Sequence, residues 1–161
     1  MDAIVSVTAD WGIGRDGSLL VRNRADMKRF KELTMGGNVI MGRKTFESLP
    51  GGPLTGRKNI VLTRSRDFAA EGVEVARSID EALEMADAHG GRTWLIGGAS
   101  LYGQFIDICD EAYVTYHDCV LEADAYFPNL DEDERWTCAE VSETDFTASG
   151  IPFHFALYRH L

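Results

Sequence analysis

Short runs of β-branched and aliphatic residues alternate with amphipathic segments along most of the chain. Such runs are typical of buried strands, whereas apolar residues spaced three or four apart are typical of helices. The predicted strands cover residues 3–8, 38–41, 59–63, 73–75, 93–96 and 112–116. The predicted helices cover about 24–35, 43–48, 79–88 and 100–108. Strands that alternate with helices predict an α/β fold with a mostly parallel sheet.

The last part of the chain has a different pattern. Residues 136–142 and 153–158 alternate between apolar and polar positions and have no predicted helix between them, which is typical of an antiparallel pair at a sheet edge. A length of 161 residues is usual for one domain. We therefore predict a single α/β domain over residues 1–161. Its mixed, mostly parallel sheet has about eight strands, an antiparallel C-terminal hairpin and about four helices distributed over both faces.

Two helix starts and two helix ends have clear signals. Asn23 stands three residues before Asp26, and Ser78 stands three residues before Glu81, which is the spacing of a capping box. Glycine pairs at 36–37 and 90–91 are expected to end the same two helices.

Composition is ordinary for a folded domain, with 45% hydrophobic and 26% charged residues, and it excludes intrinsic disorder. The first residues are acidic and no apolar run approaches about 20 residues, so we expect neither a signal peptide nor a membrane span, and a cytoplasmic location. Cys109, Cys119 and Cys138 form no CxxC, and we expect reduced thiols that act as small buried hydrophobes. The four histidines lack metal-ligand spacing, so no metal is expected.

Charge is unevenly distributed along the chain. The net charge of −10 argues against a nucleic-acid partner. Residues 1–66 nevertheless hold twelve Lys or Arg against six Asp or Glu, whereas residues 67–161 hold four against twenty. We expect an anionic small ligand on the first 66 residues. The acidic remainder is equally compatible with a role in solubility alone.

A GxGxxG pattern at Gly12, Gly14 and Gly17 follows the first predicted strand. In a dinucleotide-binding fingerprint the helix opens within the glycines, but here residues 18–22 separate them from the next helix cap. We therefore interpret residues 11–17 as a mobile loop. The segment 51–58 resembles a P-loop but lacks its Lys-Ser/Thr ending and precedes a strand, so that interpretation fails.

Three other segments are suited to phosphate groups. Residues 42–45 and 97–100 place backbone amides at the starts of two predicted helices, a pair of ends that suits a pyrophosphate. Thr63, Arg64 and Ser65 follow a strand and, with Arg43, could hold a ribose 2′-phosphate, which favours NADP over NAD. Each segment alone is also compatible with a solvated turn. Their occurrence after successive strands favours a cofactor site.

Asp26 is the one acidic residue among several apolar neighbours at 19–21, 27 and 30. A carboxylate facing an apolar pocket can form two parallel hydrogen bonds to an amidine-like ring edge, and desolvation raises its pKa. As the third residue of a helix, Asp26 could instead satisfy backbone donors. Arg57 could likewise bind a carboxylate in bidentate fashion or be a surface charge. The spacing alone leaves both pairs of alternatives open.

Taken together, six segments resemble bacterial dihydrofolate reductase in order and spacing, over essentially the whole chain. These segments are residues 11–14, 25–30, 39–48, 56–59, 96–102 and 124–128. The resemblance implies NADPH-dependent reduction of 7,8-dihydrofolate to tetrahydrofolate, by hydride transfer to pterin C6 and protonation at N5. It also implies a role in one-carbon metabolism and thymidylate synthesis, a metal-free monomer, inhibition by antifolates and a cis peptide between Gly97 and Gly98.

The resemblance further implies roles for individual residues. Asp26 matches the pterin-pairing carboxylate that assists protonation through water, and Thr115 matches the hydroxyl that supports it. Four residues match positions at the reacting rings: Asp26, Thr115, Tyr102 and Leu19. The remaining substrate contacts match Ile4, Val5, Met27, Phe30, Ser48, Leu49, Leu54, Arg57 and Ile96, with Arg57 as the anchor for the glutamate α-carboxylate. The cofactor contacts match Ser6, Ile13, Gly14, Ser18, Leu19, Gly42, Arg43, Lys44, Thr45, Leu62, Thr63, Arg64, Ser65, Arg77, Ile96, Gly97, Gly98, Ala99, Ser100, Leu101, Tyr102 and Gln104.

Two positions depart from the family pattern. Val21 stands where the family usually has a Trp whose indole helps to hold a water near the pterin, and we expect slower protonation or weaker folate binding with the fold intact. Ser100 stands where a cationic residue often helps to bind the 2′-phosphate, and we expect Arg64 to compensate. The alternatives are a pterin or aminopyrimidine reductase of the same fold, or a catalytically weak NADP-binding module. Arg57 discriminates, because a substrate without a glutamate tail would not need it.

Overall fold

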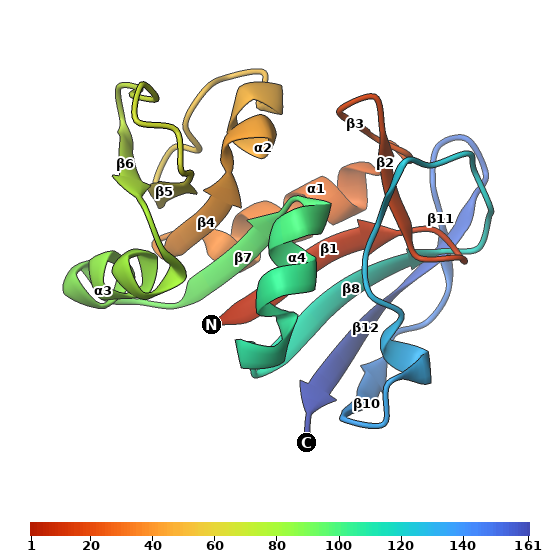
Figure 1. Ribbon diagram of the computed structural model, residues 1–161. Helices are drawn as coiled ribbons and strands as arrows, with labels where there is room; N and C mark the ends of the chain where they lie inside the picture. The colour runs from red at the N-terminus through yellow and green to blue at the C-terminus, as the bar shows by residue number, and fades with distance from the viewer.

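One large sheet runs through the computed structural model, which describes all of residues 1–161 (Figure 1). Its strands are β1 (Asp2–Val7), β4 (Asn38–Gly42), β5 (Lys58–Leu62), β6 (Val73–Ala76), β7 (Thr93–Gly97), β8 (Glu111–His117), β10 (Trp136–Val141), β11 (Asp145–Phe146) and β12 (Pro152–His160). The spatial order is β10-β12-β8-β1-β7-β4-β5-β6, and β11 pairs with β12 off this path.

Strand directions confirm the predicted mixed sheet. Every neighbouring pair from β8 to β6 is parallel, and β12 is antiparallel to both β8 and β10. The expected C-terminal pair is present, but only β10 lies at the sheet edge, because β12 is inserted between β10 and β8. A bulge between Cys138 and Glu140 interrupts the register of β10 on β12. The longer β12 therefore joins the parallel part of the sheet to its antiparallel edge.

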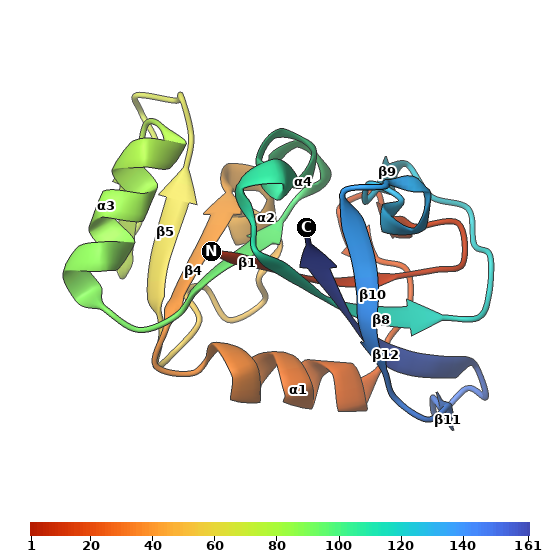
Figure 2. The same cartoon turned by 90° about the horizontal axis from the view of Figure 1, so that it is seen from below.

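Helices cover both faces of the sheet. They are α1 (Arg24–Thr34), α2 (Arg43–Ser48), α3 (Ile79–His89) and α4 (Ala99–Phe105). Side chains alternate along each strand, so that Ile40 and Leu95 join a core cluster with α3 and α4, whereas Met41 and Trp94 join a second cluster with α1. Figure 2 shows α1 on one side of the sheet and α3 and α4 on the other. The second cluster lies on the side that carries Asp26.

The predicted helix caps are present. Asn23 Oδ1 accepts hydrogen bonds from the first turn of α1, and Ser78 Oγ accepts one from Glu81 N at 3.1 Å in α3. Gly90 ends α3 with a φ of +83°, a conformation that side chains rarely adopt. The helix expected at 100–108 ends earlier, because its last turn tightens into the 3₁₀ helix η1 (Ile106–Ile108). A second 3₁₀ helix, η2 (Leu130–Glu132), precedes β10.

A small second sheet was not predicted. It consists of β2 (Gly12–Arg15), β3 (Ser18–Leu19) and β9 (Ala125–Tyr126), and both of its pairings are antiparallel. Residues 11–17, interpreted above as a loop, form β2 and the turn that leads to β3. A Cβ on Gly14 would lie 3.0 Å from the Ser18 carbonyl oxygen, so the glycine permits the close approach of the two strands. These glycines shape a hairpin, and no helix opens within them.

The cysteines correct one expectation. All three are free, but only Cys109 is buried, Cys119 is partly exposed and Cys138 is exposed. Cys138 is exposed because β10 is an edge strand that buries only Trp136. The structure contains no helix that is both long enough and apolar enough to span a membrane.

Two glycines provide a test of the packing. A Cβ on Gly37 would lie 2.5 Å from the Arg92 carbonyl oxygen, whereas a Cβ on Gly103, inside α4, meets nothing within 4 Å. We expect Gly37→Ala to lower the free energy of unfolding by about 1–3 kcal/mol. We expect Gly103→Ala to raise it by about 0.5–1 kcal/mol, because alanine is the better helix former. Urea unfolding of both variants measures this, and equal stabilities would contradict the packing at Gly37.

Candidate active site

Asp26 in the first turn of α1 faces Thr115 in β8. The Thr115 hydroxyl donates a hydrogen bond of 2.5 Å to Asp26 Oδ1. The backbone donors of this turn are satisfied by Asn23, whose Oδ1 accepts from Ala25 N at 3.0 Å and Asp26 N at 3.2 Å. The Asp26 carboxylate is therefore not needed as a helix cap. Of the two alternatives left open by the sequence, the geometry argues against the capping role.

Burial controls the protonation of this carboxyl group. The main effect is desolvation, which raises the pKa of Asp26 above the ordinary aspartate value. The hydrogen bond from Thr115 and, after it, the interactions with His117 and with the positive charge of Arg29 lower the pKa and only partly offset this effect. Asp26 therefore holds a proton to a higher pH than an exposed aspartate does.

An apolar surface lies on the same side of the sheet as Asp26. Several of the expected substrate contacts belong to this second core cluster or pack against it: Ile4, Phe30, Leu49, Leu54 and Ile96. The loop that carries Leu54 is fixed by Asn59, whose side chain accepts from Leu54 N and donates to Leu54 O, both at 2.9 Å. An apolar surface with one carboxyl group is suited to a flat ring that has a polar edge.

Other expected contacts lie outside this cluster. The Val5 side chain packs in the cluster on the opposite face, so it does not share a surface with Ile4. Leu19 in β3 is 66% exposed, and Met27 in α1 is 59% exposed. The Ser48 hydroxyl donates to the Thr45 carbonyl at 2.6 Å. Leu19 and Met27 are thus largely exposed in the protein alone, and the Ser48 hydroxyl is engaged within α2.

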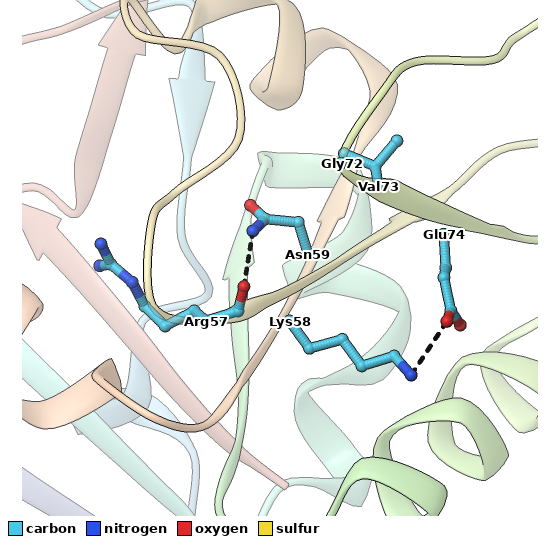
Figure 3. Close-up of a pocket in the computed structure, with 6 residues that line it drawn as sticks. All are labelled: Arg57, Lys58, Asn59, Gly72, Val73 and Glu74. Atoms are coloured by element: carbon cyan, nitrogen blue, oxygen red, sulfur yellow. Dashed lines mark hydrogen bonds and ion pairs between the residues drawn. The ribbon is translucent and has the colours of Figure 1, made fainter.

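Arg57 carries a positive charge without an acidic partner. Its guanidinium donates to the Thr55 carbonyl from Nε at 3.1 Å and from Nη2 at 2.9 Å, and to Thr34 Oγ1 at 3.2 Å. Burial lowers the pKa of Arg57, but the ordinary pKa of an arginine is so high that the guanidinium stays charged. A shallow pocket of about 390 Å³ adjoins its backbone, and Lys58 and Glu74 form an ion pair of 3.0 Å there. Figure 3 shows the guanidinium directed away from that pair.

Two helix starts meet at the ends of β4 and β7. Gly42 precedes α2 and Gly98 precedes α4, and neither helix has a side-chain cap. A Cβ on Gly98 would lie 3.3 Å from Thr45 Oγ1, so the two starts are in contact distance. Bare N–H groups at two neighbouring helix starts form a cradle for anionic oxygens.

Cationic and hydroxyl groups gather beyond β5. Arg43 Nη1 donates to Ser65 Oγ at 3.3 Å, and Arg77 donates to the carbonyl oxygens of Thr63 and Ser65. Arg43 also pairs with Glu47 at 3.2 Å, which partly neutralises it. Arg64 is exposed and forms no ion pair. The structure thus places Arg43 and Arg77, both expected cofactor contacts, in hydrogen-bond contact with the Thr63–Ser65 segment.

Tyr102 in α4 packs against the turn at Gly97 and Gly98. Its hydroxyl donates to the Ile4 carbonyl at 2.7 Å, and a Cβ on Gly97 would lie 3.2 Å from its ring. Burial raises the pKa of Tyr102, so the phenol remains protonated. The peptide between Gly97 and Gly98 is cis, as the resemblance implied. The ring also packs edge-on against Phe127, with centroids 4.7 Å apart.

The other expected cofactor contacts are spread over several elements. Ser6 is in β1, Ile13 and Gly14 are in β2, and Ser18 and Leu19 are in β3. Leu62 ends β5, Lys44 is exposed on α2, and four more residues lie on α4: Ala99, Ser100, Leu101 and Gln104. Gln104 Nε2 donates to Ser100 Oγ at 2.9 Å. Val21, at the departure from the family pattern, is 7% exposed and belongs to the core.

Sequence reasoning missed two residues beside the site. His117 was noted only for its lack of metal-ligand spacing, and Thr34 received no role. His117 is buried next to Asn23, and Thr34 holds the Arg57 guanidinium. Neither contact has a sequence signal, because each joins elements that are distant along the chain.

Comparison with known proteins agrees with this geometry. The profile of a family described as dihydrofolate reductase matches residues 1–160. The chain belongs to the dihydrofolate reductase family. It is 40% identical over 133 residues to the dihydrofolate reductase of Neisseria gonorrhoeae, covering 83% of this chain and 81% of that one. It is 39% identical over 151 residues to that of Mycobacterium tuberculosis, covering 91% and 89%.

A solved structure of the family has the same fold. The chain superposes on dihydrofolate reductase from Enterococcus faecalis, complexed with NADP(H) and RAB-propyl, with a TM-score of 0.89 and 32% sequence identity. The match covers 99% of this chain and 95% of that one. The predicted α/β fold is therefore confirmed as that of the dihydrofolate reductase family.

The raised pKa of Asp26 predicts a pH-dependent stability. Because the folded protein binds this proton more tightly than the unfolded chain, the free energy of unfolding falls as pH rises from about 4 through the folded pKa. The Asp26→Asn variant has no carboxyl group at this position, so its free energy of unfolding does not fall in this way as pH rises. We expect it to be more stable than the wild type at neutral pH and equal to it below about pH 4, by urea unfolding.

Asp87→Asn is the matched control for this experiment, because Asp87 is exposed on α3. It should show no such pH-dependent difference. An Asp26→Asn protein that is less stable than the wild type at neutral pH would show that burial does not dominate at this carboxyl group.

Proposed function

We propose that the protein is an active dihydrofolate reductase that uses NADPH to reduce 7,8-dihydrofolate to 5,6,7,8-tetrahydrofolate. The observation that carries this proposal is the Asp26 carboxyl group, hydrogen-bonded to Thr115 and placed beside an apolar surface, in a chain of this family. The product would supply one-carbon metabolism and thymidylate synthesis. We further propose that the protein works as a cytoplasmic monomer, without nucleic acid, and that antifolates compete for the same site.

Substrate binding needs one polar contact at each end of the molecule. At the ring end, the Asp26 carboxylate can accept two parallel hydrogen bonds from the amidine-like edge of a pterin. At the other end, Arg57 can take the glutamate α-carboxylate, because its charge has no acidic partner and Thr34 already orients it. The surface of Ile4, Phe30 and Leu54 lies on the same face as Asp26 and is suited to the aromatic rings between these ends.

The residues present fit an NADPH molecule. A Cβ atom at Gly42, Gly97 or Gly98 would narrow the space in front of the two helix starts. The first N–H groups of both helices have no side-chain cap. Arg43, Arg64, Arg77 and the hydroxyls of Thr63 and Ser65 would hold the 2′-phosphate. When bound, NADPH supplies the hydride. Tyr102 keeps the glycine turn in place through its bond to the Ile4 carbonyl.

Asp26 supports the protonation of the substrate at N5. Because burial raises its pKa, the carboxyl group retains a proton at a pH at which an exposed aspartate has lost it. Thr115 donates one hydrogen bond to Oδ1, which leaves further acceptor positions on the carboxyl group for the ring edge. The proton reaches N5 through water, since the ring edge that pairs with the carboxylate is not N5 itself. Val21 stands where the family usually has a Trp, and its aliphatic side chain can offer that water no hydrogen bond.

A pterin or aminopyrimidine reductase of the same fold would not need the arrangement at Arg57. The three hydrogen bonds that hold this guanidinium, and the absence of an acidic partner, favour a substrate with a carboxylate. Dihydrofolate has this carboxylate at the end of its glutamate tail.

The direct test is the loss of NADPH absorbance with dihydrofolate. We expect turnover by the wild type and a fall of at least about 10²-fold in kcat/KM for Asp26→Asn, which cannot hold the proton. Asp87→Asn changes an exposed carboxylate on α3 to the same amide and should retain wild-type activity. A wild-type protein that binds NADPH without oxidising it, or equal activity of both variants, would contradict the proposal.

The cofactor preference gives a second test. Arg64 is exposed without an ion pair, and we expect it to replace the cationic residue that Ser100 lacks. Arg64→Ala should raise the KM for NADPH by about tenfold and leave the KM for NADH unchanged, since NADH has no 2′-phosphate. The comparison of the two cofactors in one variant is its own control. Equal catalytic efficiency of the wild type with NADH and NADPH would refute a 2′-phosphate site.

A further inference from the structure

Two buried polar side chains beside Asp26 have no part in the reaction described above. Asn23 is 4% exposed and His117 is 0% exposed. Asn23 Nδ2 lies 3.0 Å from His117 Nε2, and His117 Nδ1 lies 3.0 Å from the Val7 carbonyl oxygen. The pair thus connects the start of α1 with the carboxyl ends of β1 and β8, the strand that carries Thr115.

Chemistry fixes the direction of every bond in this chain. The N–H groups of Ala25 and Asp26 can only donate, so the atom of Asn23 that faces them is its oxygen. The amide nitrogen of Asn23 therefore faces His117 and donates to Nε2. The Val7 carbonyl can only accept, so Nδ1 of His117 carries the proton. His117 is consequently neutral, with its proton on Nδ1.

We propose that His117 is a positioning residue for Asp26 and acts through Asn23. By accepting at Nε2, it holds the Asn23 amide in the one orientation that caps α1. The cap fixes the backbone of Asp26, and so fixes where its carboxylate meets Thr115. This role rests on the proposed reductase function, because the position of Asp26 matters through the reaction that it assists.

Protonation of His117 would break this arrangement. An added proton on Nε2 would point at the Asn23 amide hydrogens, and rotating that amide would turn its nitrogen toward the N–H groups of Ala25 and Asp26. Either outcome leaves a buried donor without an acceptor, at a cost comparable to a lost hydrogen bond. The buried pair is therefore compatible with neutral His117 only.

The surroundings of His117 agree with the neutral form. Burial lowers its pKa, opposed by the Val7 carbonyl on β1 and the charge of Asp26 on α1. The positive charge of Arg29 on α1 lowers the pKa of Asp26. From β12, the uncharged ring of Phe153 packs against the imidazole, with centroids 5.8 Å apart.

The first measurement needs no variant. A long-range ¹H–¹⁵N correlation spectrum of the imidazoles distinguishes a protonated from an unprotonated ring nitrogen. Between about pH 6 and about pH 8 we expect a bare Nε2 and a protonated Nδ1 at His117. A proton on Nε2 in this range would overturn the proposal, whatever the activity of the protein.

Two matched amide variants then separate the roles of the two ring nitrogens. His117→Gln can place an acceptor oxygen where Nε2 lies, whereas His117→Asn is too short to reach Asn23 but can still donate to Val7. We expect His117→Asn to speed the hydrogen exchange of the Ala25 and Asp26 amides by about tenfold. We expect kcat/KM for dihydrofolate to fall by a similar factor and its pH profile to shift. His117→Gln should restore most of both.

The amide of Glu81 is an internal control in the same spectra. Ser78 caps it in α3, a helix of the same length as α1, so a general loss of stability would accelerate its exchange as well. Equal behaviour of the two variants, or equal acceleration at Glu81, would overturn the proposal and leave His117 as a core residue only. If the wild type were inactive, the proposed function would fail, while the exchange rates would still decide whether His117 positions Asp26.

Discussion

The hydrogen bond between Thr115 and Asp26 is the contact on which the site depends. It joins the first turn of α1 to the middle of β8, residues 89 positions apart, and it holds a carboxyl group where burial disfavours its charge. An isolated helix would not keep an aspartate in this environment. The sheet below, with β1 and β8 in parallel register at Ser6 and Thr115, provides the rigid support. Burial of Asp26 lowers the free energy of unfolding at neutral pH but lets the group keep a proton for the reaction. Active sites commonly combine lower stability with activity in this way.

Parallel strands explain why the other groups meet. The carboxyl ends of β4, β5, β6 and β7 lie at one edge, so the segments that follow them are neighbours although they are far apart in sequence. Two uncapped helix starts and the cationic group of Arg43, Arg64 and Arg77 therefore lie together. The antiparallel strand β12 has another role. It covers the outer side of β8 and packs Phe153 against His117, which keeps the polar pair beside Asp26 away from water.

Much of this could be predicted from the sequence. Runs of β-branched residues indicated the central strands, and the caps at Asn23 and Ser78 placed two helices correctly because capping is a local interaction. The small sheet was missed, since β3 and β9 have two residues each and no periodicity. Cys138 was expected to be buried, but the exposure of an edge strand depends on the order of strands in space. The hydrogen-bond partners of Asp26 and Arg57 could not be predicted for the same reason, because Thr115 and Thr34 come close to them only in the tertiary fold.

The most direct test of this account is the titration of the Asp26 carboxyl carbon by ¹³C NMR in the free protein, assigned by comparison with Asp26→Asn. Because desolvation outweighs the Thr115 hydrogen bond, we predict a pKa of Asp26 clearly above the ordinary aspartate value of about 4. A pKa at or below that value would show that Asp26 is ionised whenever the protein works. The carboxyl group would then be a binding group only, and the proton for the substrate would have to come from elsewhere.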